Sequence, residues 1–156
     1  MLRLNSRRRR GNAIIEFALA SSILFPTFAG VFQFGYTFYT YNTLQGSVRA
    51  AARFASVRQY TATTSTPTSE YASEVKNMVV YGKPNPVLTA TPGVTPDIPV
   101  TSGLTTSNVA VDVAMNGGVP KTITVKVTNF TIDAIFSKFT FNGKPAATFW
   151  YNGPTN

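Results

Sequence analysis

The sequence contains neither cysteine nor histidine among its 156 residues. Without cysteine the chain has no disulfide, no thiol nucleophile and no thiolate metal site. Without histidine it lacks the commonest general base and the commonest metal ligand. These absences exclude most metalloenzymes and nearly all hydrolases with a catalytic triad, and we expect the protein to use no cofactor.

Charged residues are also few, at 13% of the chain, which is about half the share in an ordinary soluble domain. Hydroxyl side chains take their place, with 22 Thr and 11 Ser. This composition favours a secreted or filament-forming protein over a cytosolic enzyme. Asp97, Asp112 and Asp133 are scattered, and neither a glycine-rich phosphate loop nor a metal-ligand spacing accompanies them. We therefore expect no enzymatic activity.

The basic excess is concentrated at the N-terminus. The formal net charge is +8, from 14 Lys and Arg against 6 Asp and Glu. Five of the arginines lie within the first ten residues, namely Arg3, Arg7, Arg8, Arg9 and Arg10. A basic arm that binds phosphates is one interpretation of this cluster. Because a nucleic-acid-binding domain spreads its cations over a folded face, we expect no nucleic-acid partner.

An apolar segment follows the arginines directly. Residues 13–38 contain one charged residue, Glu16, and the segment exceeds the roughly 20 helical residues that cross a bilayer core. Tyr36, Tyr39 and Tyr41 cluster at its far end, where an interfacial aromatic belt would lie. Because the arginines precede the segment, the positive-inside rule predicts a cytoplasmic N-terminus and an exported remainder. We expect a single-pass protein of the inner (cytoplasmic) membrane.

The kind of membrane segment is open to three interpretations. A cleaved secretory signal would use a site such as Ala18-Leu19-Ala20, but the apolar run continues well beyond it. A plain anchor explains the length and the orientation. Neither explains Glu16, because an unpaired carboxylate in a membrane costs on the order of several kcal/mol. A helix-start acid that favours the helix dipole is a further interpretation of Glu16.

The third interpretation is a prepilin. The run RGNAIIEF, from Arg10 to Phe17, resembles the processing site of type IV prepilins, with a basic leader, a glycine and then an apolar helix. Cleavage after Gly11 would make Asn12 the first residue and Glu16 the fifth. The resemblance implies cleavage by prepilin peptidase and an assembly role for Glu16 and Phe17, in which Glu16 pairs with the terminal ammonium of a neighbouring subunit. A buried pair of opposite charges is tolerated in an apolar environment in which either charge alone would be too costly.

Further motifs continue the resemblance over residues 10–58. They are Glu16-Phe17-Ala18-Leu19, Phe34-Gly35-Tyr36, Asn42 and Ala50-Ala51-Ala52-Arg53-Phe54-Ala55. Together they are similar to the TadE-like family, minor pseudopilins of the tight-adherence (Tad, Flp-type) pilus system. The resemblance implies three partners: other pilin or pseudopilin subunits, bound through the N-terminal helix, prepilin peptidase, and the pilus assembly platform in the inner membrane.

The apolar helix is expected to continue as a stalk to about residue 60. A 49-residue helix from residue 12 would be about 70 Å long, with Pro26 kinking or locally opening it. Small residues along it permit close helix approach, namely Ala29, Gly30, Gly35 and Gly46. One stripe faces the exported domain, formed by Leu44, Val48, Ala51, Ala52 and Ala55, with Arg49 and Arg53 on a neighbouring polar face.

The remainder predicts an α+β head. Residues 69–81 are expected to form a short helix that ends at Gly82 and packs Val75, Met78 and Val79 on a sheet. Five prolines in residues 84–107 predict a surface loop. Alternating apolar residues on both sides of Asn116-Gly117-Gly118 predict a hairpin. Residues 130–141 are expected to add one or two strands. Asn142-Gly143 is expected to form a second hairpin turn that leads into residues 146–151. The aromatic residues of this last segment either close the core or form an exposed patch.

These expectations give a leader at residues 1–11, a membrane and stalk helix at 12–60 and an exported head at 61–156. The predicted function is that of a minor pseudopilin of a Tad-type pilus, cleaved after Gly11 and assembled through its N-terminal helix. A major pilin of this kind is expected to be little more than the helix, so a head of this size favours a minor subunit. The alternative is an uncleaved, membrane-anchored protein with an exported binding or adhesin domain.

Overall fold

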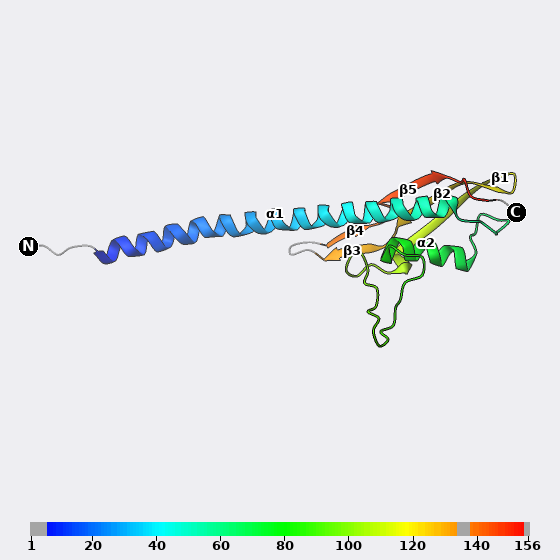
Figure 1. The fold of residues 1–156 in the computed structure, drawn as a ribbon. Coiled ribbons are helices and arrows are strands. Elements are labelled where there is room, and N and C mark those ends of the chain that lie inside the picture. The colour runs from blue at the N-terminus through cyan, green and yellow to red at the C-terminus, as the bar shows by residue number, and fades with distance from the viewer. Residues whose placement is uncertain (1–5, 134–137, 155–156) are drawn as a thin grey trace, which may run out of the picture.

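The computed structural model describes residues 6–133 and 138–154, with side chains described from residue 12. The fold is α+β, as predicted: a long N-terminal helix is followed by a head of a short helix and antiparallel sheets (Figure 1). The elements are α1 (Ser6–Val57), α2 (Ser69–Tyr81), a 3-10 turn (Thr106–Asn108), β1 (Val109–Asn116), β2 (Val119–Val127), β3 (Phe130–Asp133), β4 (Lys138–Phe141) and β5 (Ala146–Trp150).

Helix α1 is 52 residues long and begins and ends earlier than predicted. It starts at Ser6 rather than residue 12 because arginine is a good helix former and Gly11 alone does not stop a helix. It ends at Val57 because the amide of Tyr60 donates to the Tyr151 hydroxyl at 2.9 Å instead of to a helical carbonyl. The helix runs on through Pro26, so the expected local opening does not interrupt it.

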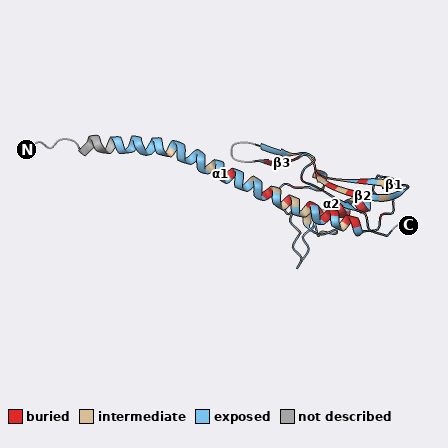
Figure 2. Ribbon diagram, turned by 90° about the horizontal axis from the view of Figure 1, so that it is seen from above, coloured by how far each residue is buried: buried red, intermediate tan, exposed pale blue. Residues whose placement is uncertain are grey.

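The predicted apolar stripe of α1 is the part of the helix that packs on the head. Its five residues are completely buried, whereas Arg49 and Arg53 are exposed on another side. Figure 2 shows the change along α1, from pale blue in its N-terminal part to red where it runs beside the head. The stalk and the head therefore share one hydrophobic core.

Helix α2 has the predicted bounds and ends at the predicted Gly82. The Thr68 hydroxyl accepts a hydrogen bond from the Tyr71 amide, and Gly82 ends the helix in the left-handed region at φ 71°. Only glycine adopts this conformation without strain. Val75 and Val79 are buried, and α2 packs on both α1 and β1. The expected packing of this helix on a sheet is confirmed, with the stalk as an additional neighbour.

The main sheet has the strand order β1-β2-β5, with all pairs antiparallel. The predicted hairpin joins β1 to β2, and its two-residue turn places Gly117 and Gly118 at φ 60° and 82°. Two successive positive φ angles are the geometry of a type I′ hairpin turn. Helix α1 lies over β2 and β5, and α2 lies over β1. Helices thus cover one face of the sheet.

The second predicted hairpin, at Asn142-Gly143, is wrong. Strand β4 pairs with β3 in a separate two-stranded ribbon, whereas β5 pairs with β2. Asn129 lies in the left-handed region at φ 51° and turns the chain out of the main sheet after β2. The amide of Gly143 then donates to the carbonyl of Val127 at 2.8 Å, which returns the chain to the end of β2. Local alternation of apolar residues is the same for either pairing.

The C-terminal aromatic residues divide between the two predicted roles. Tyr151 is half-buried against the core, and its hydroxyl lies within hydrogen-bond distance of the carbonyls of Arg58 (3.1 Å) and Pro154 (2.8 Å), to one of which its single hydrogen donates. Trp150 is 65% exposed, with the Lys121 ammonium 5.5 Å from its ring centroid. Tyr151 therefore fastens the end of the stalk to β5, and Trp150 lies at the surface.

Acidification is expected to release the long loop after α2. Asp97 fastens this loop, since its carboxylate accepts from Lys83 Nζ at 2.6 Å and from the Val87 amide at 2.9 Å. The bond from Lys83 holds the pKa of the Asp97 carboxyl below its ordinary value. Because this folded-state pKa is lowered, the stabilisation is present above the ordinary carboxyl pKa of about 3.9 and is lost as the pH falls through the folded-state value.

The amide chemical shift of Val87, followed by NMR, should therefore titrate with a midpoint below that ordinary value. Asp97→Asn should abolish the titration. A Val87 titration that persists in Asp97→Asn would contradict this anchoring role.

Candidate functional site

The N-terminal part of α1 presents its side chains outward. From residue 12 to residue 32, every residue except Ser21 and Ala29 is exposed, although most of them are apolar. At 1.5 Å per residue this stretch is about 31 Å long, close to the roughly 30 Å of a bilayer core. Among the described residues, one helix is long and apolar enough to cross a membrane. This helix indicates a single-pass membrane anchor.

Burial along α1 begins at Gln33. Gln33 and Thr40 are buried, and the ring of Tyr41 lies 5.7 Å from that of Phe141 on β4. Figure 1 shows the β3–β4 ribbon running back along α1 towards the N-terminus. Sequence reasoning did not assign Gln33 and Thr40 to the packed face because both are polar. Thr40 lies four residues before Leu44, and Gln33 lies seven residues before Thr40. This spacing continues the helical stripe and could have placed them there.

Glu16 lies within the exposed apolar stretch. None of the described side chains forms a hydrogen bond or ion pair with it, and Phe17 beside it is 74% exposed. Asn12 is also exposed. The backbone of Arg7, Arg8, Arg9, Arg10 and Gly11 is helical, and their side chains lie outside the described residues. An unpaired carboxylate in such a stretch is costly to bury once water is removed.

The glycines of α1 do not pack on the head. A Cβ atom added at Gly30, Gly35 or Gly46 would meet no described atom within 4 Å outside the helix itself. The small surface of the helix at these positions is therefore open to a neighbouring helix, which small residues allow to approach closely.

The scattered aspartates do not converge on a site. Each forms an ion pair with a lysine: Asp97 with Lys83 at 2.6 Å, Asp112 with Lys126 at 2.5 Å and Asp133 with Lys138 at 3.2 Å. Among the described residues, no group of three or more acidic, histidine or cysteine side chains could hold a metal ion.

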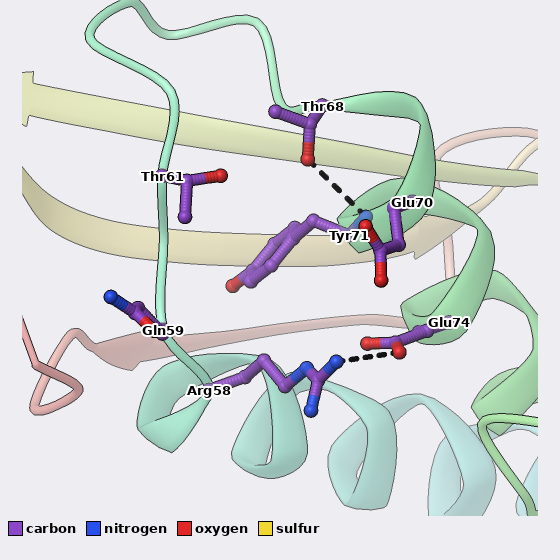
Figure 3. Close-up of a pocket in the computed structure, with 7 residues that line it drawn as sticks. All are labelled: Arg58, Gln59, Thr61, Thr68, Glu70, Tyr71 and Glu74. Atoms are coloured by element: carbon purple, nitrogen blue, oxygen red, sulfur yellow. Dashed lines mark hydrogen bonds and ion pairs between the residues drawn. The ribbon is translucent and has the colours of Figure 1, made fainter.

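A polar pocket lies where α1 ends and α2 begins. It has a volume of about 230 Å³, and Figure 3 shows the side chains around it. Arg58 Nη2 donates to Glu74 Oε1 at 2.6 Å, and Tyr71 closes the wall, with its hydroxyl donating to the carbonyl of Ala55 at 2.6 Å. Burial raises the pKa of the Tyr71 hydroxyl, so it stays protonated at neutral pH. The sequence did not indicate this pocket because Arg58, which directly follows α1, and Glu74, on α2, are 16 residues apart in the chain.

The comparisons with known proteins concern the helix. The family model described as TadE-like protein matches residues 11–53, which run from the glycine of the prepilin-like motif to the alanine-rich part of the stalk. This segment is TadE-like. The resemblance read from Glu16-Phe17 and the later motifs is confirmed. No curated protein and no solved structure matched the chain.

The TadE-like segment includes both parts of α1. It contains the exposed apolar stretch and most of the stripe that packs on the head. The match implies a protein associated with Tad pili and with their components.

Proposed function

We propose that the protein is a minor pseudopilin of a Tad-type pilus. It is inserted in the inner membrane with its head exported, cleaved by prepilin peptidase after Gly11 and assembled by lateral packing of α1 against the helices of other subunits. The role is structural rather than catalytic. In the assembled state the Glu16 carboxylate pairs with the Asn12 ammonium of a neighbour, and the head selects partners at the assembly platform.

The observation that carries this proposal is the exposure of a TadE-like helix. An apolar stretch about one bilayer thick stands outside the head and has a single carboxylate five residues after Gly11. A plain anchor would use the same length and orientation, but it would leave the carboxylate without a function. A helix that leaves the membrane to enter a filament needs such a partner for register, because uniform apolar surfaces do not fix one alignment.

N-terminal sequencing and intact mass of the protein, recovered from membranes of its own host, test the processing step. We expect the chain to begin at Asn12. In Gly11→Leu the chain should remain full-length, because a bulky side chain at the cleavage position blocks a peptidase that requires glycine. Gly30→Leu is the matched control and should be processed normally. A chain that begins at Met1 in the unaltered protein would support an uncleaved anchor with an exported binding domain instead.

A further inference from the structure

The pocket between α1 and α2 contains a buried carboxylate oxygen that lacks a donor. Glu74 is 7% exposed, and its Oε1 is bonded to Arg58 at 2.6 Å. Its Oε2 has no hydrogen-bond partner within the part of the chain that the structure describes. A buried polar atom without a partner carries the full cost of losing water. This atom therefore indicates a ligand that supplies an N–H or O–H donor.

The charge of the pocket selects among such ligands. Glu70 and Glu74 are four residues apart on α2, so they share one face. In Figure 3 both carboxylates lie on the α2 side of the pocket, that of Glu74 beside Arg58 and that of Glu70 farther from it. With one guanidinium and two carboxylates, the pocket has a formal excess of one negative charge. An anion would meet two carboxylates. A divalent metal ion would leave surplus positive charge next to Arg58. A monovalent cation with N–H donors balances the charge and supplies the donor.

The size and the rim of the pocket suit a cationic side chain. With a volume of about 230 Å³, the pocket has room for much more than one water molecule. The hydroxyls of Thr61 and Thr68 line it, and they provide further acceptors for a multivalent donor such as an ammonium or guanidinium group. The Tyr71 hydroxyl already donates to the carbonyl of Ala55, so Tyr71 forms part of the pocket wall and does not bind the guest side chain.

We propose that this pocket receives one lysine or arginine side chain from a neighbouring pilus subunit. The proposal rests on the proposed function, which places the head beside other subunits. The cationic nitrogen donates to Glu74 Oε2 and approaches the Glu70 carboxylate. Figure 1 shows the end of α1 and the start of α2 on the side of the head away from the N-terminus of α1. Because the pocket lies between these two helix ends, it is accessible whether the N-terminal part of α1 is in lipid or among other helices.

Titration of the full chain in zwitterionic micelles tests the chemistry of the pocket. The probes are N-acetyl-lysine amide, N-acetyl-arginine amide, the uncharged N-acetyl-methionine amide and calcium chloride, with binding followed by NMR of the amides of residues 58–74. We expect saturable shifts with the two cationic amides only, at a dissociation constant on the order of millimolar, as befits one small polar ligand. Binding of calcium instead, or equal binding of the methionine amide, would overturn the proposal.

Two substitutions separate binding from folding. Glu74→Gln should weaken binding of the cationic amides about tenfold or more, because it removes a buried charge. Because Glu74→Gln also removes the partner of Arg58, it affects the fold as well as binding. Glu70→Gln therefore serves as the second variant. Glu70 lies at the exposed rim, so this variant should fold normally and bind roughly twofold to fivefold more weakly. Asp112→Asn, a carboxylate of β1 outside the pocket, is the matched control and should bind unchanged. An unchanged affinity in Glu70→Gln and Glu74→Gln would refute the site.

Photo-cross-linking in the native host identifies the source of the cation. With a photoreactive residue in place of Thr61, we expect a cross-link to a peptide that contains lysine or arginine and belongs to another subunit or a second copy of this chain. The cross-link should diminish in Glu70→Gln. A cross-link to lipid only, or one that Glu70→Gln leaves unchanged, would overturn the assignment to a pilus subunit.

The titration and the processing test can fail separately. Binding of the cationic amides is measured on the isolated chain and does not depend on piliation. If the chain begins at Asn12 but the amides do not bind, the pocket proposal fails and the proposed function stands. If the amides bind but the chain begins at Met1 and no subunit is captured, the proposed function fails, and with it the subunit as the source of the cation.

Discussion

Replacement of Glu16 by alanine is expected to reduce assembled pili at least tenfold without affecting membrane insertion. The reason is electrostatic: a buried charge pair that loses one partner leaves the other charge unpaired in an apolar environment. In the proposed assembly that charge is the Asn12 ammonium of the neighbouring subunit. Insertion should be spared, because removal of a carboxylate from an exposed apolar helix makes that helix easier to insert.

The measurement is a count of pili by electron microscopy, together with fractionation of the host membranes. Glu16→Gln should fail as alanine does, because the amide keeps the shape but not the charge. Asp112→Asn, which removes a carboxylate of the head outside α1, is the matched control and should assemble nearly normally. Normal piliation in Glu16→Ala would disprove the assembly role of this carboxylate.

Substitution of Leu44 by alanine is expected to lower the free energy of unfolding of the head by about 3 kcal/mol, within the usual range for a buried leucine. Leu44 is completely buried where α1 meets the head. The lost side chain leaves a cavity between the stalk and the sheet, which the long helix cannot close by moving because its neighbours on the stripe are packed along the same face.

Leu24→Ala provides the control on the same helix. Leu24 is 53% exposed and precedes the packed part of α1, so the stability of the head should be unchanged. Urea unfolding of the full chain in micelles, followed by Trp150 fluorescence, measures both variants. Equal stabilities of Leu44→Ala and Leu24→Ala would show that the stalk and the head do not unfold as one unit.

The elements that could be predicted from the sequence are those determined by local pattern. The bounds of α2 follow from a threonine cap, a helical run and Gly82 in the left-handed region. The β1–β2 hairpin follows from alternation on both sides of a two-glycine turn. The buried stripe of α1 follows from its helical spacing. In each case neighbours in the chain supply most of the information.

The wrong hairpin shows where local pattern fails. Residues 130–151 alternate in a way that suits either a continuous meander or the observed ribbon. The choice depends on Asn129 at positive φ and on backbone hydrogen bonds that residues 143 and 145 form with Val127, which is remote in the sequence. Backbone pairing of this kind has no signature in side-chain composition.

The sequence by itself determined a charge-poor chain with a basic N-terminus, an apolar helix bearing one carboxylate, and the TadE-like motifs that the family comparison confirmed. These features lie on one helix or one segment, so periodicity and spacing reveal them. Cleavage after Gly11 and the pairing of Glu16 stay predictions. Only the tertiary structure decided that burial along α1 begins at Gln33, that β5 joins β2, and that Arg58 and Glu74 line a pocket with an oxygen that has no partner within the described chain. Each of these depends on contacts between residues far apart in the chain, whose desolvation and pairing arise only when the elements pack.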